Sequence, residues 1–415
     1  MTDPLIFVRG IHLAATLLAA GTLGFATLVA EPALIGVDAA ALRGRLKLIS
    51  WLALAVAIPS GATWLVLLAA EILGESPLHA CLNGGVWSVT AFTQFGEVWM
   101  ARFVLACLLA IVIGFHRLRW LTLAVAIALT ALIAYSGHAA GTPGAAGVVH
   151  LASDMLHLAA AGAWLGALPG LALLLVAAAT GGDAWQAAAV VAVRRFSTLG
   201  IAAVATLIVT GAINSWNLLD GPRDLIATAY GNLLLAKLAL FAIMLGFAAI
   251  NRLRLTPRLP QHRAMTALVR NTMAEIVLGL GVLGVVAALG VTEPGAHAGH
   301  ASTAIPPDAA FVHIHTSEIM AEVTINPGHP GRAKVSLRVM HEDGSEFPAK
   351  AVSLALDPPN AQAPAKARPA LRQSDGTWLI GEIEFAAPGV WTARVTVDTG
   401  GKEPLVVDGP IVIER

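Results

Sequence analysis

The stretch His150-Leu-Ala-Ser-Asp-Met-Leu-His157-Leu-Ala-Ala-Ala-Gly-Ala-Trp-Leu-Gly166 opens an apolar run that continues to about residue 179. A membrane-spanning helix needs about 20 such residues. At about 100° per residue, His150, Asp154 and His157 fall on one helical face. Ionisable side chains at membrane depth are costly and usually serve ion binding, proton transfer or pairing. Two imidazoles and a carboxylate also suit copper or zinc. The alternative is that His150 and Asp154 lie in headgroup water while His157 is a hydrogen-bonded packing residue.

The composition extends the membrane interpretation to the whole chain. Its 415 residues are 57% hydrophobic and only 13% charged, whereas a soluble globular protein is about 25% charged. We therefore expect an integral protein of the lipid bilayer. The formal net charge is zero, so no basic surface points to nucleic acid. Cys81 and Cys107 are too few for a disulfide framework or a Cys-rich zinc module.

Apolar windows of about 20 residues predict eight membrane spans. They cover roughly 5–30, 47–70, 98–115, 119–137, 149–179, 197–217, 230–250 and 269–291. Arginine and lysine are concentrated in alternate loops between these spans. Because basic loops stay in the cytoplasm, both termini are expected on the extracytoplasmic side.

The last third of the chain has a different pattern. A small-residue linker over 293–310 contains His297 and His300, and stretches of alternating apolar and polar residues follow. Alternation bounded by Pro, Gly and Asp is typical of short antiparallel strands. The expected fold is an all-α polytopic membrane bundle over 1–292, followed by a small extracytoplasmic β-sandwich over 311–415.

The membrane part contains an internal repeat. Phe95-Gly-Glu-Val-Trp-Met-Ala-Arg102 matches Tyr230-Gly-Asn-Leu-Leu-Leu-Ala-Lys237 position by position, and Arg117-Leu-Arg119 recurs at the same offset as Arg252-Leu-Arg254. His12-Leu-Ala-Ala, followed by Gly21, likewise resembles His157-Leu-Ala-Ala, followed by Gly166. Two four-helix halves in the same orientation are therefore expected, and sites in such proteins often lie where the halves meet.

The repeat makes His12 and His157 equivalent histidines, as metal ligands or as residues hydrogen-bonded within their own halves. Arg102 and Lys237 are interpreted as helix-end cations that extend to the membrane interface. In the tail, Phe-Val-His313-Ile-His315 predicts two imidazoles on one face of a strand, with Met320 and Met340 nearby in sequence. The complete set of predicted metal ligands is His12, His138, His150, Asp154, His157, His313 and His315.

Several motifs resemble a known family. They are Phe196-Ser-Thr-Leu-Gly-Ile-Ala-Ala-Val-Ala-Thr-Leu-Ile-Val-Thr-Gly211, Thr228-Ala-Tyr-Gly-Asn-Leu-Leu-Leu-Ala-Lys237, Ala-Ile-Asn251-Arg252 and the stretch from His157 to Gly166. Together they are similar to the CopD/PcoD family of bacterial copper-resistance membrane proteins. The resemblance implies an inner-membrane protein that moves copper from periplasm towards cytoplasm, often with a periplasmic CopC-like copper chaperone. The tail is similar to the β-domains that follow CopD in some copper transport proteins.

The leading hypothesis is thus copper transport and copper resistance, with a copper ion of undetermined oxidation state and no enzymatic activity. The sequence has no Gly-x-x-x-x-Gly-Lys-Ser/Thr motif, which argues against ATP-driven pumping. One alternative is a haem-binding redox protein, in which His12 and His157 bind haem from two sides. A third is a copper-sensing scaffold whose tail reports extracytoplasmic copper.

Overall fold

The computed structural model describes most of the chain. The described residues are 4–73, 76–92, 94–137, 144–219, 221–259, 261–292, 306, 308–315, 319–341, 345–359, 365–401 and 404–413. Two compact units divide them: a helical unit of residues 1–69 and 81–298, and a second unit of residues 299–415 with the segment 70–80.

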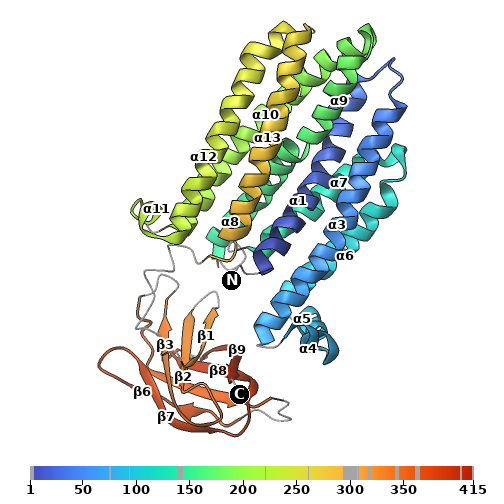
Figure 1. Ribbon diagram of the computed structural model, residues 1–415. Coiled ribbons are helices and arrows are strands. Elements are labelled where there is room, and N and C mark those ends of the chain that lie inside the picture. Colours follow the sequence, from blue (N-terminus) through green and yellow to red (C-terminus); the bar gives the residue numbers. More distant parts are fainter. Residues whose placement is uncertain are drawn as a thin grey trace. The chain divides into compact units, whose positions relative to one another are not determined.

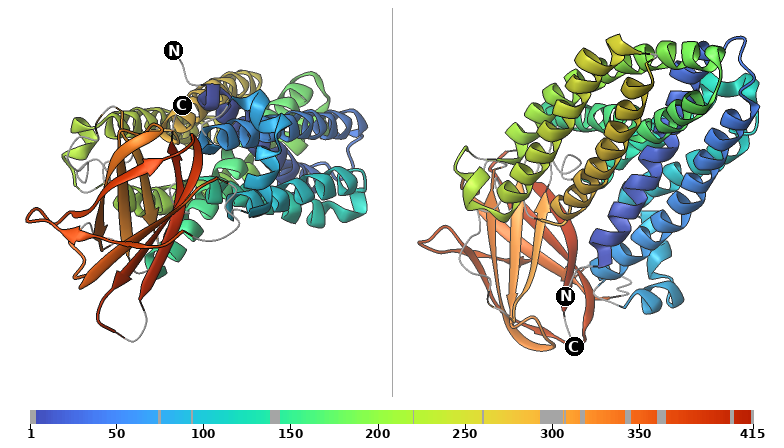
Figure 2. Two further views of the ribbon diagram at one scale, coloured as in Figure 1. Left: turned by 90° about the horizontal axis from the view of Figure 1, so that it is seen from below. Right: turned by 45° about the horizontal axis from the view of Figure 1, so that its top comes forward.

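The helical unit is a bundle of long helices that run side by side (Figures 1 and 2). Its main helices are α1 (Pro4–Gly24), α3 (Ala40–Leu73), α6 (Gln94–Val112), α7 (Arg119–Ala131), α8 (Gly144–Ala161), α9 (Leu168–Thr180), α10 (Asp183–Leu218), α12 (Ala229–Ile250) and α13 (His262–Leu289). Its shorter elements are η1 (Phe25–Ala30), α2 (Glu31–Ala33), α5 (Gly85–Phe92), η2 (His116–Leu118), η3 (Leu132–Ser136), η5 (Gly162–Gly166), α11 (Asp224–Ala227), η6 (Asn251–Leu255) and η7 (Thr256–Arg258). The short helix α4 (Pro77–Leu82) begins in the segment that is grouped with the second unit.

Eight spans within the described residues are long and apolar enough to cross a membrane, which confirms the predicted number. They cover Pro4–Ala33, Ala40–Glu71, Phe95–Val112, His116–Ser136, Gly147–Thr180, Asp183–Leu218, Ala229–Arg258 and His262–Leu289. Several extend beyond the predicted windows because their helices continue into polar flanking residues, which an apolar window leaves out. The fifth span joins α8, η5 and α9, so the opening motif lies on a single continuous path.

The two halves meet at equivalent glycines. Gly21 follows His12 by the same number of residues as Gly166 follows His157, and both glycines are buried. A Cβ on Gly166 would lie 3.1 Å from the Cα of Gly21 and even closer to the carbonyl oxygen of Leu17. A Cβ on Gly21 would overlap the backbone of Gly166. Small residues allow membrane helices to approach this closely. The contact supports two repeats related about an axis through the crossing of α1 and η5.

The second unit is a β-sandwich, as predicted. One sheet has the strand order β1-β2-β3-β7-β6 and the other β5-β4-β8-β9, and the paired strands are antiparallel. The strands are β1 (Ala310–His315), β2 (Met320–Asn326), β3 (Gly331–Met340), β4 (Ala351–Asp357), β5 (Arg368–Pro369), β6 (Leu371–Arg372), β7 (Trp378–Phe385), β8 (Gly389–Asp398) and β9 (Leu405–Ile413).

Alternating residues of both sheets form the core of this unit. Val323, Val335 and Val395 are fully buried, and Phe385 meets Trp391 edge to face with ring centroids 5.0 Å apart. Aromatic pairs with this geometry stabilise a core beyond the area they bury. The period-two pattern of the sequence therefore corresponds to real inward and outward faces. The predicted boundaries of the linker and of this domain stay predictions.

Two valines in the same sheet allow a matched test of this core. Val395 on β8 is fully buried, whereas Val406 on β9 is 50% exposed. Val395→Ala is expected to lower the unfolding free energy of this unit by about 2 kcal/mol, because two methyl groups leave a packed core. Val406→Ala should change it by less than about 0.5 kcal/mol. Protease susceptibility of the C-terminal unit in the full-length, detergent-purified chain, followed during heating, measures both. Equal effects would contradict the described core.

Candidate functional site

A cavity of about 500 Å³ lies in the helical unit, between α1, α8, α10, α12 and α13. His150, Asp154 and His157 all line it, as do Lys237 and Arg9. His150 is only 2% exposed. The stripe predicted from the spacing on α8 therefore faces a cavity. We call this space the His157 cavity.

Hydrogen bonding fixes the tautomer of His157. Its Nδ1 lies 2.9 Å from the hydroxyl oxygen of Thr210, and that hydroxyl donates its own proton to the carbonyl of Thr206 at 2.6 Å. The Thr210 oxygen therefore accepts from Nδ1–H, and the lone pair of the neutral imidazole lies on Nε2. A histidine whose Nδ1–H is anchored to an oxygen is the usual arrangement of a metal ligand.

Asp154 is set in place by α10 and lies near a lysine of α12. The side-chain amide of Asn214 donates to Oδ1 of Asp154 at 3.2 Å. Lys237 interacts electrostatically with both Asp154 and His157. Within the membrane a lone carboxylate is expensive, and a nearby ammonium lowers that cost. The positive charge of Lys237 therefore partly offsets the negative charge of Asp154.

His12 lies elsewhere, packed within the first half. Its Nδ1–H donates to the carbonyl of Ala57 at 2.9 Å, and the guanidinium of Arg102 donates to its Nε2. The rings of Trp64 and Trp99 lie 5.7 and 5.6 Å from the imidazole. Both ring nitrogens thus have protein partners, and His12 does not line the His157 cavity. This arrangement matches the alternative in which equivalent histidines bond within their own halves.

The interpretation of Arg102 as a cation that extends to the membrane interface was wrong. Arg102 is 2% exposed, and its Cζ lies 4.4 Å from the ring centroid of Trp99. Lys237 also faces inward, onto the His157 cavity. Both residues lie about two turns inside their helices, next to an equivalent histidine. The prediction considered only their distance from the helix end, and the histidine and aromatic groups that hold them come from other helices.

The surroundings of the two histidines correspond residue by residue. Ser60-Gly61-Ala62 on α3 matches Thr210-Gly211-Ala212 on α10, and each hydroxyl lies beside the Nδ1 of its histidine, at 3.2 and 2.9 Å. At the next matching positions the halves differ in chemistry. Trp64 stands where the second half has Asn214, and Arg9 where it has Asp154. Aromatic rings therefore fill the first half, while the second half keeps polar groups around open space.

The described residues contain no group of three His, Cys, Asp or Glu side chains close enough to hold a metal ion as they stand. His138 lies outside the described residues. His313 and His315 lie in β1, where the register pairs His313 with Glu322 and His315 with Met320. Met320 is paired in turn with Met340 on β3. The strand register thus places His315 in one row with two methionines across three strands.

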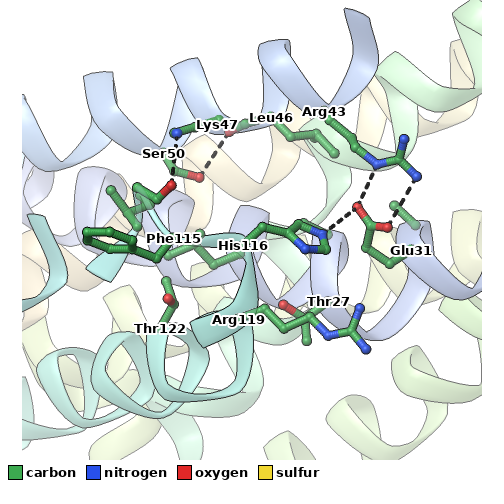
Figure 3. Close-up of a pocket in the computed structure, with 15 residues that line it drawn as sticks. Thr27, Glu31, Arg43, Leu46, Lys47, Ser50, Phe115, His116, Arg119 and Thr122 are labelled. Atoms are coloured by element: carbon green, nitrogen blue, oxygen red, sulfur yellow. Dashed lines mark hydrogen bonds and ion pairs between the residues drawn. The ribbon is translucent and has the colours of Figure 1, made fainter. Parts of the chain in front are cut away.

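A smaller pocket, of about 150 Å³, lies near the other end of α1 (Figure 3). Glu31 accepts hydrogen bonds from Nε and Nη2 of Arg43 at 2.8 and 3.2 Å, and Nε2 of His116 lies 3.5 Å away. Figure 3 shows both groups pointing at the same carboxylate. The pairs join three segments of the first half, which is a structural role.

The exposure of this ion pair predicts a small effect on stability. The Arg43 side chain is 41% exposed and that of Glu31 18%. Because solvent screens such pairs, Glu31→Gln is expected to lower the unfolding free energy by no more than about 1 kcal/mol. Thermal unfolding in detergent measures the change. A loss several times larger would show that the pair is essential to the fold of the first half.

Comparison with known proteins identifies the family. The family models "Copper resistance protein D-like, N-terminal domain" and "Copper resistance protein D" match residues 1–148 and 190–289. Over 252 residues the chain is 32% identical to "Copper resistance protein D" of Pseudomonas syringae pv. tomato, covering 57% of this chain and 80% of that protein. The chain belongs to the copper resistance protein D (CopD) family. The predicted resemblance is confirmed.

Two further relatives support this placement in the CopD family. "Inner membrane protein YebZ" of Escherichia coli (strain K12) is 33% identical over 214 residues, covering 50% of this chain and 72% of that protein. "Copper transport protein CutJ" of Bacillus subtilis (strain 168) is 28% identical over 302 residues, covering 66% of this chain and 51% of that protein. No solved structure matches. With its eight spans, this chain is a multi-pass inner-membrane protein of the CopD family.

No sequence motif pointed to Thr210 and Asn214, which hydrogen-bond to His157 and Asp154. They lie on α10, 53 and 60 residues away from His157 and Asp154. The repeat was the one available signal, because the Ser-Gly-Ala and Thr-Gly-Ala motifs could have been matched as the histidine motifs were.

Proposed function

We propose that this CopD-family protein binds copper in the His157 cavity and moves it from the periplasm towards the cytoplasm. The observation that supports this most directly is the geometry of His157. Its Nδ1–H is anchored to Thr210, which leaves the lone pair on Nε2, and the cavity that His157 lines is also lined by His150 and Asp154. Imidazole nitrogen is a good ligand for copper in either common oxidation state.

The copper site would be completed by small side-chain movements. The cavity is large enough for an ion with its ligands, and both Asp154 and His157 are on α8, one helical turn apart. A cation that approaches Asp154 meets the ammonium of Lys237, which must move away or lose its proton. Binding is therefore expected to rearrange the cavity rather than to fill a preformed ligand set.

The β-sandwich would serve as the capture site in the same process. In the register of β1, β2 and β3, His315, Met320 and Met340 occupy one row, and imidazole with thioether suits Cu(I). A periplasmic CopC-like partner would deliver copper to this unit or directly to the bundle. Both termini would then lie on the periplasmic side, in keeping with the alternation of basic loops.

Metal analysis of the detergent-purified, full-length protein tests the membrane site. Cells are grown with added copper, and bound copper is measured in the wild type and in His150→Ala, Asp154→Asn and His157→Ala. We expect His157→Ala to lower the affinity at least about tenfold, because it removes the oriented lone pair. His315→Ala should lower the total stoichiometry and leave the affinity of the membrane site unchanged.

His12→Ala and His116→Ala are the matched controls. His12 has protein partners at both nitrogens, and His116 lies beside Glu31, far along the chain from the His157 cavity. Neither is expected to change copper affinity by more than about twofold. Loss of copper in His12→Ala equal to that in His157→Ala would contradict the assignment. A strong Soret absorption band that disappears in His157→Ala would show that His157 binds haem, and it would contradict the copper assignment.

A further inference from the structure

A buried acid lies deep in the second half, away from the His157 cavity. Glu275 is in the middle of α13 and is 2% exposed. It is inside the span His262–Leu289. Ionisable residues within a membrane span are rare and usually functional, because a charge at that depth costs several kcal/mol unless it is paired.

The partners of Glu275 are neutral. The side-chain amide of Asn251 donates to Oε1 at 2.6 Å, and Asn271 donates in turn to Asn251 at 2.8 Å. The buried indole of Trp164 also hydrogen-bonds the carboxyl group. These donors satisfy the carboxyl oxygens without neutralising a charge. Both a carboxylate and the carbonyl oxygen of a carboxylic acid accept hydrogen bonds from such donors, so no neighbouring charge fixes the group in one protonation state.

Glu275 also lines a cavity of about 380 Å³, which we call the Glu275 cavity. Among the described residues in its lining, Arg252 is the other charged group, and its guanidinium donates to the hydroxyl of Ser197 at 2.5 Å. Of the charged groups on the helices that pack against α13, Lys237 of α12 and Arg9 of α1 line the His157 cavity instead.

The two cavities follow one another along α10, α12 and α13, helices that lie close together in Figure 1. Ile208 lines both of them. Phe241 lines the His157 cavity and Trp164 lines the Glu275 cavity, and their rings meet edge to face at 5.8 Å. An ion leaving the His157 cavity past these two rings would enter the space beside Glu275.

We propose that Glu275 is a proton-exchanging site on the copper path, which releases its proton when a copper ion enters the Glu275 cavity. The O–H bond of the carboxylic acid breaks and the proton leaves to water, while the resulting carboxylate balances the charge of the ion. When the ion departs, the carboxylate binds a proton again. This inference rests on the proposed copper transport and adds a residue of α13 that no ligand motif contains.

Infrared spectroscopy tests the protonation step without transport. The metal-free, full-length protein should show the C=O stretching band of a buried carboxylic acid, and Cu(I) should diminish it. We expect the band to be absent in Glu275→Gln and retained in Glu31→Gln, whose carboxylate is paired with Arg43. Glu275→Asp should keep the band at a shifted frequency. The difference between the wild type and Asp154→Asn gives any contribution that the Asp154 carboxyl group of the His157 cavity makes to this band. A band that persists unchanged in Glu275→Gln would overturn the proposal.

Copper uptake into proteoliposomes, with the same pH on both sides, tests the functional step. Protons compete with copper for the carboxylate of Glu275. Below the pKa of this group, the uptake rate of the wild type divided by that of Glu275→Gln should therefore fall about tenfold for each unit by which the pH is lowered. Glu31→Gln should follow the wild-type profile. A ratio that does not change with pH would exclude Glu275 from the path. Absence of uptake by the wild type at every pH would instead contradict the proposed transport. The infrared result would then show whether copper binding removes the proton of Glu275.

Discussion

Gly166→Ala is expected to cost the helical unit about 3 kcal/mol of unfolding free energy, although alanine is normally the better helix residue. The added methyl group would overlap the carbonyl oxygen of Leu17 and press on the Cα of Gly21. Both contacts are with backbone atoms, which no rotamer change can move aside, so the halves must separate. Thermal unfolding of the detergent-purified chain, followed by loss of helical circular dichroism, measures the effect.

Two other glycines within the long helices provide the control. Nothing lies within 4 Å of a Cβ built on Gly200 of α10 or on Gly246 of α12. Gly200→Ala and Gly246→Ala are therefore expected to stabilise the protein by up to about 1 kcal/mol, through helix propensity alone. Gly166→Ala should therefore lower the unfolding free energy, whereas Gly200→Ala and Gly246→Ala should raise it. A stabilising Gly166→Ala would refute the close crossing of α1 and η5.

The transmembrane architecture could be predicted from the sequence because it depends on local properties. Twenty apolar residues span a bilayer whatever their partners, so eight windows corresponded to eight spans. The β-sandwich followed from period-two alternation for the same reason. The glycine crossing was present in the repeat as two matched positions, Gly21 and Gly166. The contact between these two glycines could not be predicted, because hydropathy does not show which helices pack against each other.

The candidate site could be predicted only in part. The spacing on α8 placed His150, Asp154 and His157 on one face, and the structure shows that this face lines a cavity. The repeat then suggested that His12 was an equivalent ligand. Repeats preserve backbone positions, but the side chains around them diverge. Trp64 replaces an amide and Arg102 occupies Nε2 of His12, so the equivalence of the two histidines does not extend to their chemistry.

Glu275 could not be recognised as a functional residue from a sequence motif. Its sequence neighbourhood, Asn271-Thr-Met-Ala-Glu275, contains no ligand spacing. Its importance comes from Asn251 and Trp164, on two other elements. A single acid in an apolar span was a usable signal, since such residues are rare at that depth. The identity of its partners required the packing of three helices.

Lys237→Met is expected to raise the affinity of the His157 cavity for copper by about 10- to 100-fold. The ammonium interacts with both Asp154 and His157, so it competes with any cation that approaches them. Two like charges about 4 Å apart repel by about 4 kcal/mol at an effective dielectric constant of 20, and partial relaxation leaves about 1.4 to 2.8 kcal/mol of this in the measured affinity. Competition titration against a chelator of known copper affinity measures the change.

Two variants separate loss of charge from loss of shape. Lys237→Arg keeps a cation, as at Arg102 in the first half, and should leave copper affinity within about threefold of the wild type. Arg102→Met removes a cation that faces His12 and Trp99 and should leave copper affinity unchanged. If Lys237→Met binds copper no more tightly than the wild type, the lysine does not compete with the metal.

Tighter binding should also slow the release of copper, because the returning ammonium would no longer help to displace the ion. Lys237 would then set affinity low enough for transport, and Lys237→Met should retain copper while losing flux.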